Sequence, residues 1–214
     1  MEYKIEDICK DVRVCLDMNL DNSALKSIGD VDTLEIDDII RSKISDAARS
    51  IERDCETYML DRGEAFATSV EWDGQKGIGS GSTLLPDDFL RLVSFKMSDW
   101  DYACTTAISE DSTEYTLQKS RYYGLRGNPQ SPVVAIVHAP TGLKLEFYSC
   151  EAGANVNVEH ARYIPIPRIR DGRINVCEKL YPAIVHYTAS LAAMTLGNND
   201  MATVLKNMSE DLAK

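Results

Sequence analysis

The sequence predicts an α+β fold in which helices from both ends of the chain form a helical bundle and the middle forms a mostly antiparallel β module. Near both ends, apolar residues recur at helical spacing. In the middle, short segments rich in β-branched and aromatic residues follow one another and do not alternate with helices, which excludes a doubly wound parallel sheet. We expect residues 1–63 and 173–214 in the helical bundle and residues 64–172 in the β module.

Two helices are predicted in the N-terminal part. Residues 3–18 place their apolar side chains in one stripe, as a short amphipathic helix does. A polar stretch then separates this helix from a longer one that reaches about residue 60. Asp32 and Glu35 have the spacing of a capping box at the start of the longer helix, and Gly63 stands where a helix would stop.

Strand patterns bounded by Gly, Pro, Asp or Ser fill the middle of the chain. They lie at residues 66–72, 89–97, 132–139, 142–150 and 161–169. Residues 139–142, Ala-Pro-Thr-Gly, predict a tight hairpin turn between two of these strands. Residues 112–129 predict a short helix and a loop that ends at Pro129.

The C-terminal part predicts two more helices. An apolar stripe runs from Val176 to Met194, and Pro182 either kinks this helix or marks a later start in its first turn. Residues 197–200, Gly-Asn-Asn-Asp, break the pattern, and residues 201–212 form a last short helix.

The composition is that of a globular protein in a reducing compartment. The chain has 214 residues, of which 44% are hydrophobic and 27% charged. It has no run of about 18 apolar residues, so no membrane span is expected, and its charged beginning does not fit a signal peptide. Six cysteines are scattered along the chain, mostly among apolar neighbours, which favours reduced thiols over a disulfide framework.

The net charge of −11 is concentrated early in the sequence. Residues 1–73 hold 9 basic and 19 acidic residues, whereas the remaining residues hold 14 basic and 15 acidic ones. Such an acidic surface repels phosphate backbones. It is interpreted either as a solvated helical face or as a wall that DNA passes without binding.

The glycine-rich stretch at residues 74–83 does not form a phosphate-binding motif. A P-loop requires Lys after the second glycine, and Ser80 follows Gly79. A dinucleotide fingerprint requires a third glycine where Ser82 stands. The stretch therefore predicts a hairpin loop or a flexible connection.

No constellation of residues predicts catalysis, cofactor binding or metal binding. The histidines belong to no zinc motif; they are His138, His160 and His186. Cys150 with His186 is one of many Cys–His pairs that the sequence allows. The acidic pairs suit helix starts or turns; they are Asp37-Asp38, Asp87-Asp88 and the mixed pair Asn199-Asp200. We expect no enzyme, and the alternative is a small intracellular hydrolase or transferase that uses a Cys or an Asp pair.

Two segments combine basic and aromatic residues, a mixture that binds acidic protein surfaces, binds nucleic acid or rims an ordinary sheet. Their members are Lys119, Arg121, Tyr122, Tyr123 and Arg126, and then Arg162, Tyr163, Arg168, Arg170 and Arg173. Prolines in the second segment predict an extended, unpaired chain that reaches toward a neighbour. A regulatory protein-interaction module is therefore a further alternative.

Residues 84–95, Leu-Leu-Pro-Asp-Asp-Phe-Leu-Arg-Leu-Val-Ser-Phe, follow a glycine turn and an amphipathic helix pair. This arrangement resembles the head-to-tail adaptor proteins of short-tailed phages, which include the tail-tubular gateway class and the ring proteins of crAss-like phages. The hairpin sequence at residues 143–148 and the Ala-rich helix at residues 180–197 fit the same pattern. The resemblance covers roughly residues 35–196 and is carried by Leu85, Pro86, Asp88, Phe89 and Arg91.

The resemblance implies a structural protein of the virion, located at the head–tail junction and made in the host cytoplasm. Such adaptors form a dodecameric ring below the portal, extend the DNA channel and carry the next tail component. The implied partners are the portal protein, a neighbouring tail or ring protein and further copies of the chain. DNA passes through without specific binding, and no membrane, metal or cofactor is implied.

A closed ring requires two different patches on each subunit. Opposite charge predicts these patches at the acidic face of the helix at 35–60 and at a basic strip between residues 162 and 173. The candidate interface residues are Asp37, Asp38, Glu52, Glu56, Arg162, Arg168, Arg170 and Arg173. Whether the acidic helix faces the channel or the outside stays open.

Overall fold

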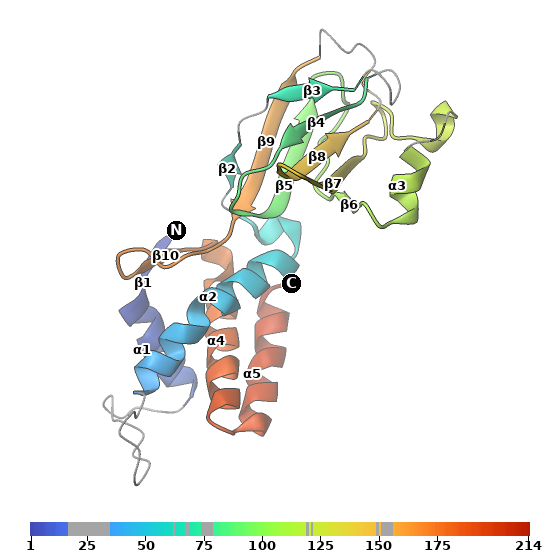
Figure 1. The fold of residues 1–214 in the computed structure, drawn as a ribbon. Helices are drawn as coiled ribbons and strands as arrows, with labels where there is room; N and C mark the ends of the chain where they lie inside the picture. The colour runs from blue at the N-terminus through green and yellow to red at the C-terminus, as the bar shows by residue number, and fades with distance from the viewer. Residues whose placement is uncertain are drawn as a thin grey trace. The chain divides into compact units, whose positions relative to one another are not determined.

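The computed structural model of the chain confirms the α+β class and divides the chain into two units (Figure 1). It describes residues 1–16, 35–61, 63–66, 69–73, 79–118, 120, 122–148, 150 and 156–214. The helical unit consists of Met1–Arg62 and Ile166–Lys214, and the β unit consists of Gly63–Pro165. The β unit is therefore a single stretch of chain, whereas the helical unit is assembled from both ends.

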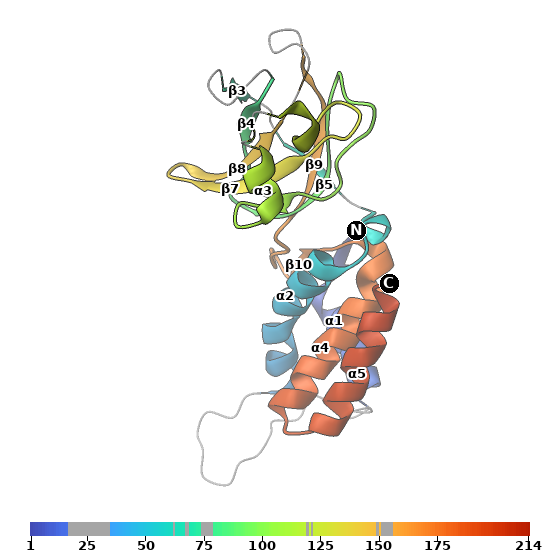
Figure 2. The same ribbon diagram turned by 90° about the vertical axis from the view of Figure 1, so that its right-hand side faces the viewer.

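Helix α4 is the central element of the helical unit. The unit contains α1 (Ile5–Cys15), α2 (Ile36–Asp54), α4 (Tyr181–Thr195) and α5 (Asn199–Leu212). Helix α4 contacts each of the other three, and Figure 2 shows it running beside α5. Small residues on several sides of α4, such as Ala183, Ala189 and Ala193, are fully or almost fully buried, which lets neighbouring helices approach closely.

Helix α2 is shorter than its apolar stripe predicts. It ends at Asp54 because Cys55 takes an extended backbone conformation, with ψ of 166°. A short 3₁₀ turn at Thr57–Met59 then accounts for the apolar residues up to position 60. At the other end Glu35 is the N-cap residue, and Asp32, the other half of the predicted capping box, lies outside the described residues.

A two-stranded sheet that the sequence did not predict belongs to the helical unit. Strand β1 (Glu2–Lys4) pairs antiparallel with β10 (Arg173–Asn175), and α1 starts directly after β1. This pairing holds residues 166–175 in the helical unit. The boundary therefore follows Pro165, earlier than the predicted boundary after residue 172.

Pro182 marks a helix start and does not kink the helix. It lies in the first turn of α4, where proline's missing N–H costs no hydrogen bond, and a 3₁₀ turn at Glu178–Leu180 precedes it. Helix α4 ends before Gly197, whose φ of 82° suits glycine. Asn198 then caps α5 by accepting a hydrogen bond from the backbone N–H of Met201 at 3.2 Å.

We expect Asn198→Ala to destabilise the helical unit by about 1 kcal/mol, because it removes this capping hydrogen bond. Urea unfolding followed by far-UV circular dichroism measures the change. Asn199→Ala, next to it at an exposed position, is the matched control and should change the free energy of unfolding by less than about 0.5 kcal/mol. Equal losses in the two variants would show that the cap does not act as described.

In its described residues the β unit forms two sheets, and all but one of the strand pairings there are antiparallel, as predicted. One sheet has the order β2 (Glu64–Ala65), β9 (Val158–Pro165), β5 (Phe89–Met97). The other has the order β3 (Val70–Trp72), β4 (Gly81–Leu84), β8 (Gly142–Phe147), β7 (Val134–Ala139), β6 (Ile108–Ser109). Only β6 and β7 are parallel among the described strands. Aromatic rings fill the core between the strands, with Phe95 stacked on Phe66 and on Phe147.

Several local predictions for the β unit are confirmed. Strand β5 has the predicted bounds, and the predicted hairpin turn joins β7 to β8, with Ala139 paired to Gly142. Helix α3 (Thr113–Gln118) and a 3₁₀ turn at Tyr123–Leu125 lie in the predicted helix-and-loop segment. Of the strand predicted at 66–72, only Val70–Trp72 form a strand, β3, and β2 ends at Ala65 before the predicted start.

The glycine-rich stretch connects β3 to β4. The backbone N–H of Asp73 donates to the carbonyl oxygen of Ser80 at 2.9 Å, so the chain reverses between them, as the hairpin interpretation requires. Residues 74–78 lie outside the described part. Gly79 follows with a φ of 77°, and its carbonyl accepts the backbone N–H of Cys150 at 2.9 Å.

Candidate interaction surfaces

The acidic helix α2 presents less free charge than its sequence suggests. Asp37 forms an ion pair with Arg13 of α1, with the Arg13 Nε atom 2.7 Å from the carboxylate, and both side chains are largely buried. Asp38 is about half exposed and lies 3.7 Å from Arg41, a spacing at which an exposed pair contributes little. Asp37 therefore ties α1 to α2, and Asp38 remains available to a partner.

The prediction that Glu52 lies at an interface is wrong, because its side chain is completely buried. Its Oε1 atom accepts a hydrogen bond from the backbone N–H of Cys177 at 2.7 Å. Ile44, Ala48 and Glu52 succeed one another at four-residue spacing, and the first two are also fully buried. This spacing was the signal in the sequence that Glu52 lies on the inner face of α2.

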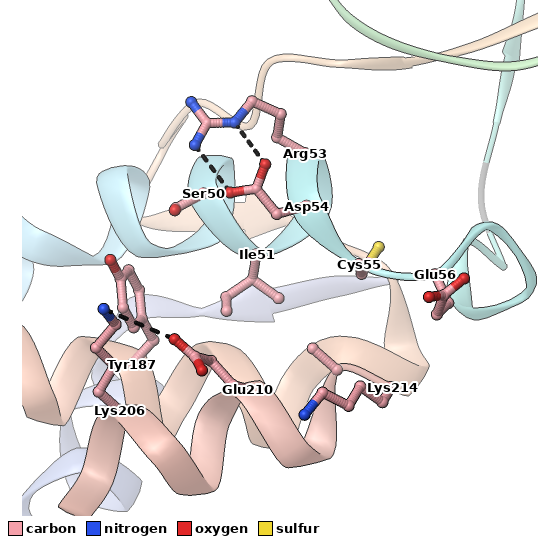
Figure 3. Close-up of a pocket in the computed structure, with 11 residues that line it drawn as sticks. Ser50, Ile51, Arg53, Asp54, Cys55, Glu56, Tyr187, Lys206, Glu210 and Lys214 are labelled. Carbon is pink, nitrogen blue, oxygen red and sulfur yellow. Dashed lines mark hydrogen bonds and ion pairs between the residues drawn. The ribbon is translucent and has the colours of Figure 1, made fainter. Parts of the chain in front are cut away.

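Glu56 is exposed beyond the end of α2 and lines a pocket of about 530 Å³ (Figure 3). The rest of the lining comes from the end of α2, Tyr187 of α4 and the last turns of α5. The charges there are paired locally, Arg53 with Asp54 at 2.8 Å and Lys206 with Glu210 at 3.7 Å. The pocket is therefore a groove of mixed charge.

The predicted basic strip is divided between the two units. Arg162 is exposed on β9 of the β unit, whereas the exposed Arg168, Arg170 and Arg173 belong to the helical unit. The last three form one local structure, which we call the basic hairpin and define as residues 168–173. The candidate residues on the helical unit therefore form a patch of their own.

The basic hairpin is paired, not unpaired as its prolines predicted. Arg170 and Arg173 exchange two backbone hydrogen bonds of 2.9 Å across Asp171-Gly172, whose φ angles are 51° and 70°. An Asp-Gly pair is the preferred sequence for such a two-residue hairpin turn, a signal that the proline argument overlooked. The guanidinium of Arg173 also contacts Glu2 at 3.2 Å, which ties the hairpin to β1.

The charge of the protein is spread over both units. The helical unit has 15 basic and 21 acidic residues, and the β unit has 8 and 13, so the net charges are −6 and −5. The excess of acid in residues 1–73 is thus not confined to the helical unit, because Glu64, Glu71 and Asp73 lie in the β unit.

Cys150 has the properties of a structural thiol. It lies in the core of the β unit, and burial, with a smaller contribution from Asp99, raises its pKa to about 12. A thiol with so high a pKa is protonated at neutral pH, and the thiolate is the nucleophilic form. His186 lies on α4 of the helical unit, where its Nδ1 atom donates to the carbonyl oxygen of Pro182 at 2.8 Å.

Asp87 and Asp88 form a turn before β5, one of the two roles that the sequence suggested. The backbone N–H of Phe89 donates to the carbonyl of Pro86 at 3.0 Å and closes this turn. Asp88 accepts a hydrogen bond from the Tyr163 hydroxyl at 2.9 Å, and burial together with this carboxylate raises the pKa of Tyr163 to about 12. Asp88 thus links the turn before β5 to Tyr163 of β9.

Metal ligands and membrane spans are not apparent in the part of the chain that the structure describes. Within it, no three His, Cys, Asp or Glu residues are grouped as metal ligands would be. No helix there is both long and apolar enough to cross a membrane. Lys119 and Arg121 of the first basic segment lie outside the described residues.

The chain matches no protein-family model, and no curated protein is significantly similar to it. The function is therefore argued from the surfaces described above.

Proposed function

We propose that this protein is a subunit of a head-to-tail connector ring in a short-tailed phage, docked below the portal and carrying the next tail component. The basic hairpin carries the proposal. It places exposed arginines in a rigid turn on a unit whose net charge is −6. A ring subunit needs two different, mutually attractive patches, and such a hairpin suits an acidic surface on a neighbouring copy.

The organisation of the chain and its charge also support the proposal. A helical unit with an inserted β unit is the arrangement that the family resemblance implies. Both units are acidic, so either one, lining a channel, would let DNA pass without the release of counterions that drives phosphate binding. The proposed location is the virion at the head–tail junction.

Electron microscopy of the chain mixed with the portal protein encoded in the same genome tests this function. We expect a ring of copies attached to one face of the portal. The full chain carrying Arg168→Ser and Arg170→Ser should decorate the portal less, because the contacts between neighbours weaken. A portal that stays bare with the unaltered chain would rule out the connector role.

A further inference from the structure

Helix α5 has an apolar face that is not covered by the helical unit. Its inner face is buried against α4 through Ala202, Leu205 and Ser209. A second stripe follows at the same helical spacing; its members are Met201, Val204, Met208 and Leu212. Val204 is 59% exposed, Met208 45% and Leu212 40%, in contrast to the buried inner face. We call these four residues the α5 stripe.

Acidic side chains border the α5 stripe. Asp200 precedes Val204 by four residues and Asp211 follows Met208 by three, so both lie at neighbouring positions on the helix surface. Both aspartates are exposed. Asp211 has an exposed contact with Lys214 at 3.2 Å, a kind of pair that holds its partners weakly. An apolar stripe with an acidic border is complementary to an apolar side chain between basic ones.

The basic hairpin has that composition. The segment that leads into its turn contains Arg168, Ile169 and Arg170 in succession, all exposed, and Ile169 is 39% exposed. Residues 168–173 contain three arginines and one aspartate, a net charge of +2 on an acidic unit. The reciprocal bonds between Arg170 and Arg173 fix the turn before any partner binds, which lowers the entropy lost on association.

The two surfaces lie on opposite sides of the same unit. Figure 1 shows the hairpin on the side where α1 lies, and α5 on the other side of α4. Both α1 and α5 contact α4. A contact between patches on opposite sides of a subunit is heterologous, and repeated contacts of this kind close into a ring or extend as a filament.

We propose that the basic hairpin of one copy binds the α5 stripe of the next copy, with Ile169 against Val204 and Met208 and the arginines against Asp200 and Asp211. The inference rests on the proposed function, because a ring requires such a contact between copies. It replaces the predicted acidic partner on α2, where Asp37 is paired with Arg13 and Glu52 is buried.

Charge reversal tests the contact. Sedimentation velocity of the full chain over a range of concentrations measures the dissociation constant between copies. We expect Arg168→Glu with Arg170→Glu to weaken association at least about tenfold, and Asp200→Lys with Asp211→Lys to do the same, because each places like charges together. Val204→Glu should have a similar effect, since it puts a charge in the apolar stripe without altering a buried position.

Mixing the two charge-reversed proteins is the decisive measurement. In each variant alone, the hairpin and the stripe carry the same charge, so its copies repel one another. In the mixture, the hairpin of each variant can bind the oppositely charged stripe of the other variant. Association should therefore return to within about threefold of the unaltered chain. Recovery also shows that both variants are folded. The charge-matched controls change exposed residues on α1 and α2 and should leave association unchanged; they are Lys10→Glu with Arg49→Glu, and Glu6→Lys with Asp46→Lys.

The outcomes separate this inference from the connector function. Rings on the portal that tolerate all the reversals would overturn the hairpin-to-stripe contact and leave the connector function standing. Recovery in the mixture together with a bare portal would support the contact and contradict the connector function. An unaltered chain that stays monomeric both alone and with the portal would overturn both.

Discussion

Glu52→Ala is expected to destabilise the helical unit by about 2–4 kcal/mol. The substitution leaves the buried backbone N–H of Cys177 without its 2.7 Å acceptor and opens a cavity where a fully buried side chain stood. Far-UV circular dichroism during urea unfolding measures the loss. The two tryptophans, Trp72 and Trp100, lie in the β unit, so the urea unfolding curve followed by their fluorescence should differ little from that of the unaltered chain.

Glu52→Gln separates the hydrogen bond from the volume. Its amide oxygen still accepts from Cys177, so we expect a loss of only about 1 kcal/mol. Glu56→Ala removes the same side chain from an exposed position four residues later and should cost less than about 0.5 kcal/mol. If Glu52→Ala behaved like Glu56→Ala, Glu52 would not be the buried link between α2 and the chain before α4.

Gly79→Ala is expected to destabilise the β unit by about 2–4 kcal/mol. A Cβ atom at this position would overlap the carbonyl oxygen of Cys150, and the φ of 77° disfavours any L side chain. The backbone of the two segments would have to separate, with loss of the 2.9 Å hydrogen bond between them. Tryptophan fluorescence during urea unfolding reports this loss, because Trp100 lies in the core of the β unit.

Gly124→Ala is the matched control for Gly79→Ala. A Cβ atom there meets nothing within 4 Å, and the glycine does not have a positive φ. We expect its effect to be within about 1 kcal/mol and, if anything, stabilising, because alanine restricts the unfolded chain. Similar tryptophan unfolding curves for the two variants would contradict the close approach of Gly79 to Cys150.

Local sequence patterns predicted those elements that are specified by their own residues and by the turn residues next to them. Strand β5 is rich in apolar and aromatic residues and is bounded by turn residues, and the hairpin at Ala139–Gly142 carries its own turn sequence. Pairing partners far apart were not predictable in this way. Strand β1 is formed by only three residues because β10 lies beside it. Strand β4 (Gly81–Leu84) has one large apolar residue, Leu84, and its other three residues are small or polar, so no strand pattern selects it.

The candidate surfaces show the same limit. Exposed arginines at 168 to 173 were predictable from charge, and the spacing along α2 could have indicated an inward Glu52. Its partner was not predictable, because the backbone N–H of Cys177 lies 125 residues later. The spacing of Met201, Val204, Met208 and Leu212 is visible in the sequence, but α5 has two apolar faces. Only the packing of Ala202 and Leu205 against α4 decides which face remains exposed.

The insertion of the β unit into the helical unit has a consequence for synthesis. On the ribosome α1 and α2 emerge early, yet their central partner α4 follows only after the whole of residues 63–165. The β unit is contiguous, so it has all its strands before the helical unit has its core. During that interval the apolar faces of α1 and α2 lack this partner, and the proposed contact between copies must wait for α5, which follows α4. The order of the chain therefore delays the proposed association until the helical unit has formed.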